Sequence, residues 1–215
     1  NWETCSVSHR QLMKLQTQGF LPTADLVPVR AGMTSFNGGA QAENFPNPSR
    51  GERVCFVPFL LRGVGFPIHP FLRGLLEYYG LQLHSLTPAS ILHIAGYVAL
   101  CELFLGCEAH FNLWRRLFCL VPRNQGGSIF EVGGAEVWRI AGTGYLSGTP
   151  KKAPEEWPSE WFYIDDVALP DPVRMGLPKF SNAPLKKHHS WRPRSLEEED
   201  SAEISLLLGK IKTLA

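Results

Sequence analysis

The residues best suited to contact a polyanion lie in two separate stretches of the chain. The longer stretch, near the C-terminus, intersperses basic side chains with rings: Lys186, Lys187, His188, His189, Trp191, Arg192 and Arg194. Cationic side chains pair with phosphates, and an indole ring can stack on a base. The shorter stretch is Arg115-Arg116, which lies beside Trp114. Both stretches are therefore candidate nucleic-acid contacts.

Each stretch also has a simpler interpretation. The acidic run from Glu197 to Asp200 offsets the neighbouring basic charge, so a solvated linker explains the C-terminal stretch more simply than a binding site does. Arg115 and Arg116 fall on the polar side of an expected helix, where a pair of arginines is ordinary. His188-His189 could bind a metal ion loosely, but a solvated tail is the favoured interpretation.

The thiols and imidazoles near the middle of the chain are of the types that zinc prefers as ligands: His93, Cys101, Cys107 and His110. Their spacing does not favour a site. His93 and Cys101 are eight residues apart on one expected helix, and the cysteines form no close Cys-x-x-Cys pair. Burial in the core is the favoured interpretation, and we expect neither a metal nor a cofactor.

Catalysis would need an assembled set of reactive groups. Asp165 and Asp166, with Asp171, Glu131 or Glu136, could hold two divalent ions as integrase-type enzymes do. Adjacent carboxylates on a strand point to opposite faces, which disfavours this arrangement. Cys101 with His93 or His110 is equally weak as a nucleophile and base, because an apolar setting raises the pKa of a thiol. The chain also has no nucleophile-elbow, phosphate-loop or aspartic-protease motif. We expect a protein that is not an enzyme.

Composition limits the function classes further. The chain has 215 residues, of which 44% are hydrophobic and 19% charged, and this suits a globular protein with a sizeable core. A net charge of +1 argues against attraction of the whole molecule to polyanions, so any such contact must be local. The cysteines are odd in number and lie mostly in apolar runs, and no signal peptide or long uninterrupted apolar run is present. We expect a nuclear or cytoplasmic protein without a membrane partner. The first residue is Asn1 rather than Met, as in a piece of a longer reading frame.

Apolar spacing and helix-punctuating residues predict the elements that position these groups. Helices are expected at about residues 8–18, 70–79, 88–105 and 108–120, and the third of these is apolar nearly all round, which predicts a buried central helix. A strand is expected at 53–61, a hairpin of 128–132 with 135–140 around Gly133-Gly134, and a further strand at 161–164. The fold class is α+β, with a helical core of three or more helices and a small antiparallel sheet.

The C-terminal part has a different composition. Five prolines between Leu169 and Pro193 predict a segment that lies extended over the surface or is disordered. Residues 196–214 have the pattern of a short amphipathic helix. We therefore expect a domain at 1–166, a proline-rich basic linker at 167–195 and a terminal amphipathic helix at 196–215.

Several short motifs follow one another between Gly51 and Leu120. They are Gly51-Glu52, Phe66-Pro67, Tyr79 to His84, Leu86-Thr87-Pro88, Ile91-Leu92-His93, Leu100 to Gly106 and Leu113-Trp114. In this order they resemble the "putative gypsy-type transposon" domain of plant genomes, a retrotransposon-associated family. Val132-Gly133-Gly134 and Glu160 to Tyr163 extend the similarity to roughly residues 10 to 165. The family name describes a genomic origin, so the resemblance supplies no catalytic residues.

The resemblance implies a transposable-element-derived protein. Together with the residues above, it leads us to expect a non-catalytic module for assembly or nucleic-acid association. The expected partners are nucleic acid, a second copy of the chain or another element-encoded protein. A metal-dependent nuclease or integrase-type enzyme is the main alternative, and a decayed element copy without activity is another. The apolar face of the terminal helix is a further candidate for self-association.

Overall fold

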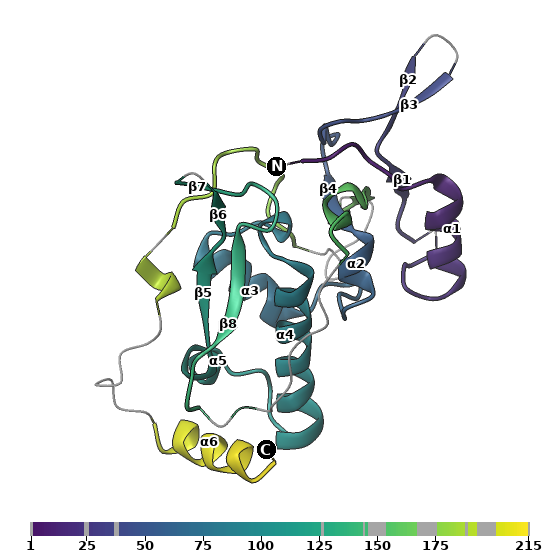
Figure 1. Ribbon diagram of the computed structural model, residues 1–215. Helices are drawn as coiled ribbons and strands as arrows, with labels where there is room; N and C mark the ends of the chain where they lie inside the picture. Colours follow the sequence, from purple (N-terminus) through teal and green to yellow (C-terminus); the bar gives the residue numbers. More distant parts are fainter. Residues whose placement is uncertain are drawn as a thin grey trace.

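The computed structural model describes residues 2–23, 26–36, 39–125, 127–143, 145, 154–166, 176–187, 189–192 and 201–214. The fold is α+β, as the sequence predicts, with helices packed against small antiparallel sheets (Figure 1). The helices of the described part are α1 (His9–Thr17), α2 (Val57–Leu60), α3 (Pro70–Tyr79), α4 (Pro88–Ala99), α5 (Phe111–Leu117) and α6 (Ala202–Leu214). A π-helix, η2 (Leu100–Leu105), continues α4, and short 3-10 turns occur at η1 (Leu83–Ser85), η3 (Trp157–Ser159) and η4 (His189–Trp191).

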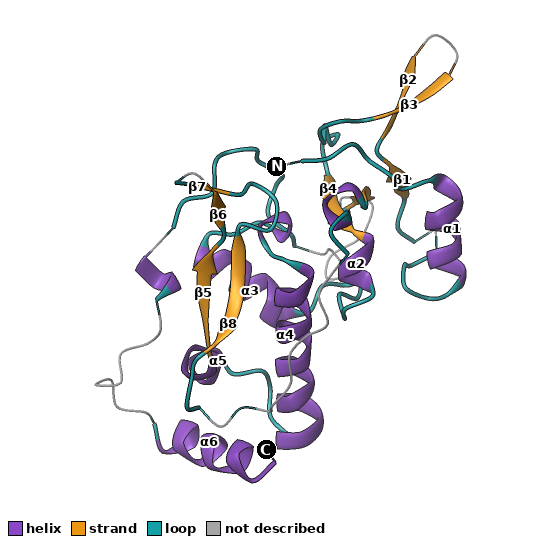
Figure 2. Ribbon diagram, in the orientation of Figure 1, coloured by secondary structure: helices purple, strands orange, loops and turns teal. Residues whose placement is uncertain are grey.

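The largest sheet joins strands that are far apart in the sequence. The strands are β1 (Val29–Ala31), β2 (Met33–Phe36), β3 (Gly39–Ala42), β4 (Glu52–Phe56), β5 (Phe118–Pro122), β6 (Asn124–Gln125), β7 (Ser128–Ile129), β8 (Ala135–Arg139) and β9 (Trp161–Asp165). Figure 2 labels β1 to β8. β9 lies between β1 and β4 and is antiparallel to both, with Tyr163 opposite Arg30 and Val54. Residues 161–164 are buried, so this strand forms the sheet's core.

The expected hairpin around Gly133-Gly134 is wrong. β8 pairs with β5, while β7 pairs with β6. Gly134 instead allows its backbone to lie close to that of Phe130, because a Cβ at Gly134 would be only 2.0 Å from the Phe130 carbonyl oxygen. The Gly133 N–H donates to the His84 carbonyl at 2.8 Å. α5 is also shorter than expected, because the chain changes from helix to strand at Phe118.

The helix boundaries around the centre of the molecule are confirmed. Thr87 caps α4 by accepting a hydrogen bond from the Ser90 N–H at 3.1 Å. His69 does the same for α3 through its Nδ1 atom, which accepts from the Phe71 N–H at 3.1 Å. Gly80 and Gly106, with φ of 63° and 67°, end α3 and η2 in the left-handed conformation that glycine adopts at least cost.

Trp114 is the ring on which the helices converge. It is 1% exposed, and its ring centroid lies 5.6 Å from Phe71, 5.2 Å from Tyr97 and 4.3 Å from Phe118. These neighbours belong to α3, α4 and β5, so one indole ties three elements together. Trp114 thereby anchors α5 on the central helix, α4.

The central helix is only partly enclosed. The stretch Pro88–Leu105 is long and apolar enough by composition to cross a membrane, with a mean hydropathy of 1.6, and 44% of it is buried inside the protein. Ile91, Ile94 and Tyr97 face the core. Leu103 and Phe104 are 76% and 69% exposed, so the helix predicted to be buried is covered on one side and open to solvent at its C-terminal end.

The chain after β9 packs on the rest of the molecule where it is described. Residues 176–187 have no regular structure, as predicted, but Leu177 is buried and Phe180 packs on the core. α6 contacts α5 and buries Ile204, Leu207 and Ile211 (Figure 1). The C-terminal segment is therefore part of the packed body and not only a solvated linker.

His84 gives this packing a pH dependence. Its ring lies between Trp2 and Phe180, with centroids 5.1 Å and 5.6 Å away, and burial lowers the pKa of His84 from its ordinary value near 6.5 to about 4. Protonation thus favours the unfolded chain. The stability is full above about pH 7 and falls as the pH drops from about 6.5 towards 4, by about 2 kcal/mol at pH 5.

Urea unfolding at pH 7.5 and pH 5 measures this loss. The His84→Gln variant removes the titrating group, so its stability should change less between the two pH values by about 2 kcal/mol. Equal pH dependence in the two proteins would show that His84 is not buried as a neutral ring.

Candidate nucleic-acid interface

Arg115 of α5 lies near the C-terminal end of α3. The guanidinium carbon of Arg115 is 5.8 Å from the centroid of the Tyr78 ring, a cation–π contact. The Arg115 Nε atom is covered and has no hydrogen-bond partner in the described part of the chain. Tyr78 is held by an edge contact with Phe111 at 4.6 Å and remains 44% exposed. Arg115 and Arg116 are both half-buried.

Trp191 brings the C-terminal basic stretch to the same end of α3. Its indole Nε1–H donates to the carbonyl oxygen of Tyr79 at 3.3 Å, and η4 contacts β5. Trp191 is fully buried, so the expectation that its ring is available to stack on a base is wrong. Its role is that of an anchor, because burying a large aromatic ring holds the chain in place.

The remaining members of the basic stretch are exposed where the structure describes them. Lys186, Lys187 and Arg192 all project from the surface, and Arg192 directly follows the anchor. Arg194 lies outside the described residues, as do the side chains of His188 and His189 and the acidic run from Glu197 to Asp200. We call the set Tyr78, Arg115, Arg116, Lys186, Lys187 and Arg192 the α5–η4 face.

The dipole of α3 explains without any ligand why arginines lie near its C-terminal end. The last carbonyls of α3 carry the negative end of the helix dipole, which attracts cations. Arg115 lies next to this end, Arg192 directly follows the tryptophan that is hydrogen-bonded to it, and Arg116 has an interaction of its own within the protein. The lysines Lys186 and Lys187 are exposed and make no contact of this kind with the described residues. They are the members of the face with the most freedom to meet a phosphate.

A second exposed ring occurs on the strand next to this face. Trp138 on β8 is 53% exposed and lies opposite Cys119 of β5. Ala135 and Val137 point into the core, so the alternation along β8 directs Trp138 outwards. The period-two pattern of this strand was a signal that could have identified Trp138 as an exposed aromatic residue.

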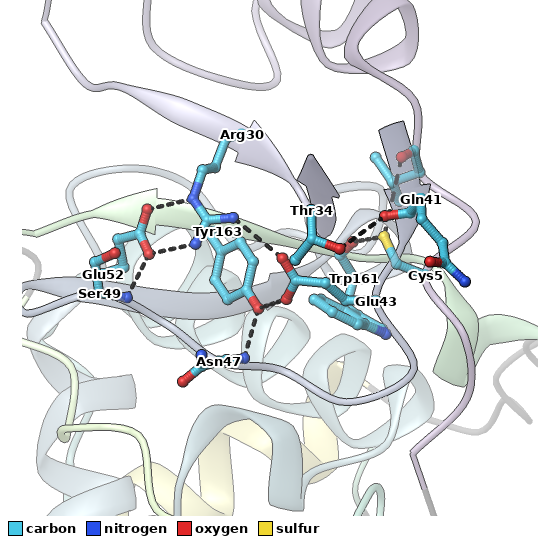
Figure 3. Close-up of polar contacts among 11 residues, drawn as sticks. Cys5, Arg30, Thr34, Gln41, Glu43, Asn47, Ser49, Glu52, Trp161 and Tyr163 are labelled. Atoms are coloured by element: carbon cyan, nitrogen blue, oxygen red, sulfur yellow. Dashed lines mark hydrogen bonds and ion pairs between the residues drawn. The ribbon is translucent and has the colours of Figure 1, made fainter. Parts of the chain in front are cut away.

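Sequence reasoning missed a polar network on the large sheet (Figure 3). Arg30 on β1 donates two hydrogen bonds to the Glu52 carboxylate, at 2.6 and 2.8 Å, and its guanidinium lies 3.8 Å from the centre of the Tyr163 ring. The Tyr163 hydroxyl donates a short hydrogen bond to Glu43 and accepts one from the Asn47 N–H at 2.7 Å. The network joins β1, β4, β9 and the segment after β3.

The protonation states of this network suit a structural role. Burial, and then the bond to Glu43, raises the pKa of Tyr163, which keeps its proton. Burial opposes ionisation of Glu52, but the hydrogen bonds from Arg30 and Ser49 outweigh it and hold the pKa of that carboxyl below its usual value. The carboxylates of Glu43 and Glu52 are only 7% and 14% exposed. Covered groups whose polar atoms are already bonded to one another are poorly placed to exchange protons with a substrate.

The carboxylates proposed for two-ion catalysis do not form a cluster where the structure describes them. Asp166 is 5% exposed, and its Oδ2 lies 3.6 Å from the Arg53 Nη2, while Asp165 lies opposite Glu52 at the end of β9. Within the described ranges, no three His, Cys, Asp or Glu side chains are placed to hold a metal ion. Asp171 lies outside those ranges.

The central thiol and imidazole are separate from each other as well. Cys101 is fully buried, and burial raises the pKa of its thiol. The ring of His93 packs on Phe118 with centroids 5.7 Å apart. His110 caps α5 through Nδ1, and its carbonyl oxygen accepts a hydrogen bond from the Tyr97 hydroxyl at 2.5 Å. These side chains serve packing and capping.

Comparison with known proteins identifies one part of the chain. The model of the family described as "Putative gypsy type transposon" matches residues 54–122. The match runs from β4 to the end of β5 and includes α2 to α5, and it confirms the recognition of a gypsy-type transposon domain. No curated protein and no solved structure matches the chain.

Proposed function

We propose that this gypsy-type transposon domain is the core of a non-catalytic module that associates with nucleic acid and assembles with other proteins of its element. The observation that carries the proposal is the meeting of two basic stretches at one end of α3. Arg116 and Lys186 are 70 residues apart along the chain. The contacts of Arg115 with Tyr78 and of Trp191 with Tyr79 hold both stretches at neighbouring residues.

The chemistry of the α5–η4 face suits a phosphate backbone with an adjacent base. Lys186, Lys187 and Arg192 supply exposed cations, and Tyr78 supplies an exposed ring that can stack on a base. Stacking and charge together are typical of contacts with single strands, whose bases are accessible. With a net charge of +1, the affinity should be modest and confined to this face.

The non-catalytic part of the proposal is supported by the state of the candidate reactive groups. Asp166 is covered and faces Arg53, Cys101 is buried in apolar surroundings, and Tyr163 is bonded to Glu43. Each of these groups already has a structural contact. A reaction centre would instead need reactive groups that are open to a substrate.

Charge-removal variants test the interface directly. K186A/K187A/R192A removes three exposed cations from the α5–η4 face, and R10A/K14A/R50A removes three exposed cations from α1 and the loop before β4. Fluorescence anisotropy with a labelled single strand at low salt should show affinity reduced by about tenfold or more for the first variant only. Equal losses would indicate non-specific attraction and would overturn the assignment. Circular dichroism confirms that both variants are folded.

Substitution is a better test than truncation. A chain that ends at Ile164 would also lose Leu177, Trp191 and α6, which bury apolar side chains against the rest of the molecule. Its loss of binding could therefore reflect loss of folding. The exposed lysines and arginine can be replaced without uncovering the core.

A further inference from the structure

We propose that the exposed side of α4 and η2 binds a second copy of this chain, in a two-fold symmetric dimer. This deepens the assembly part of the proposed function and does not depend on nucleic-acid binding. The surface has a groove of about 280 Å³ between α3, α4 and the loop before α3. Its lining is almost entirely apolar and includes Gly63, Val64, Leu72, Ala95, Val98 and Ala99. Bulky apolar side chains project beside it.

The groove is shallow at one point because small residues meet there. A Cβ added to Gly63 would lie 2.6 Å from the Cβ of Ala95, so the loop backbone lies directly on α4. Ala99 follows one turn later on the same side of the helix. Space for a side chain of another molecule is left by the rest of the groove, which Leu72, Val98 and Ala99 line.

The projecting side chains lie at the end of the same helix. Leu103 lines the groove and is 76% exposed, and Phe104 beside it is 69% exposed. Leu61, at the end of α2 and two residues before Gly63, is 59% exposed. Single exposed apolar residues are common, but several around one apolar groove are typical of an interaction site.

The surface is complementary to itself. Ala95, Ala99 and Leu103 recur at intervals of four residues, and all three line the groove. A two-fold axis near Ala99 would bring Leu103 of each copy to the groove of the other. In a two-fold dimer every contact occurs twice in this reciprocal way. The surface meets this condition, because it has both a projecting side chain, Leu103, and a groove beside it.

The charges favour a second copy as the occupant. Pro88–Leu105 contains no Lys, Arg or Asp, and its only carboxylate, Glu102, is paired with His69 at 3.0 Å across the groove. Each Glu102 carboxylate keeps this polar partner, so association of two identical surfaces buries no charge that lacks a polar contact, which would be costly. A membrane is a poorer occupant, because spanning it would require α4 to leave the core where Tyr97 and Cys101 are fully buried.

The size of the surface predicts a weak dimer. An 18-residue helix is about 27 Å long, and stable interfaces bury about 800 Å² on each partner. The helix must therefore be supplemented by Leu61 and the loop before α3. We expect association that depends on concentration, with a dissociation constant in the micromolar range.

Sedimentation velocity without nucleic acid tests the dimer independently of the proposed interface. Over about 1 to 200 μM, the species of 24.0 kDa should give way to one of twice that mass. L103E/F104E should weaken the dimer at least about 100-fold, because each contact occurs twice. The matched control is L206E, which introduces a negative charge in place of an exposed leucine of α6 (61% exposed).

Three outcomes would overturn the dimer. The first is a chain that stays at 24.0 kDa over the whole range. The second is loss of the dimer in L206E but not in L103E/F104E, which would place self-association on the terminal helix. The third is binding to vesicles of uncharged phosphatidylcholine that requires Leu103 and Phe104, without dimer formation. Failure of nucleic-acid binding would leave these measurements unaffected.

Discussion

Replacing Trp114 with alanine should lower the free energy of unfolding by about 3–5 kcal/mol. The indole is 1% exposed and contacts rings from α3, α4 and β5, which cannot all move inwards to fill the space. The cost therefore includes the lost burial and the cavity left behind. Urea unfolding followed by circular dichroism measures it. Because the stability of most domains is 5–15 kcal/mol, this variant would be close to the limit of folding.

Trp138 is the matched control for this prediction. It is also an indole, but it lies on the outer side of β8 and is 53% exposed. Its replacement with alanine should change the free energy of unfolding by at most about 1 kcal/mol. Similar losses for the two variants would mean that Trp114 is not the junction of the helical core. Trp114→Phe, which keeps a ring, should lose less than Trp114→Ala.

Replacing Trp191 with alanine should also cost about 3 kcal/mol or more. The ring is fully buried, and its Nε1–H donates to Tyr79 at the end of α3. The loss should be accompanied by faster proteolysis near residues 186–192, since these residues are held against β5 through η4. Nucleic-acid affinity should fall as well, because Arg192 would no longer be held next to α3.

A solvated linker predicts the opposite result for this variant. In that case Trp191→Ala would leave the unfolding curve and the proteolysis rate unchanged. Arg192→Ala is a control that removes charge next to the anchor without opening a cavity, since Arg192 is exposed. It should lower the affinity for nucleic acid while leaving the stability within about 0.5 kcal/mol of the original.

Local signals predicted the helical core well. Thr87-Pro88 and His69-Pro70 begin helices, and Gly80 and Gly106 end them, because capping and left-handed backbone depend on adjacent residues. The pairing of strands was not predictable in this way. The partners of β9 lie more than 100 residues earlier in the chain, and β8 pairs with β5 although Gly133-Gly134 had the spacing of a local hairpin turn.

The candidate site was predictable as two sets of residues but not as one surface. The basic character of residues 186–192 and of Arg115-Arg116 is visible in the sequence. Their meeting depends on the burial of Trp191 against the end of α3, which no spacing rule indicates. The network of Arg30, Glu43, Glu52 and Tyr163 was missed for a similar reason, because its members come from three strands and the segment after β3.

The salt dependence of nucleic-acid binding tests the central claim most directly. For the intact chain and a labelled single strand, the logarithm of the association constant should fall linearly with the logarithm of the salt concentration. The slope for K186A/K187A/R192A should be smaller in magnitude by about 2, because about 0.7 counterions are released for each phosphate contact with a single strand. Binding that is absent, independent of salt, or equal in slope for the two proteins would contradict a nucleic-acid interface at the α5–η4 face.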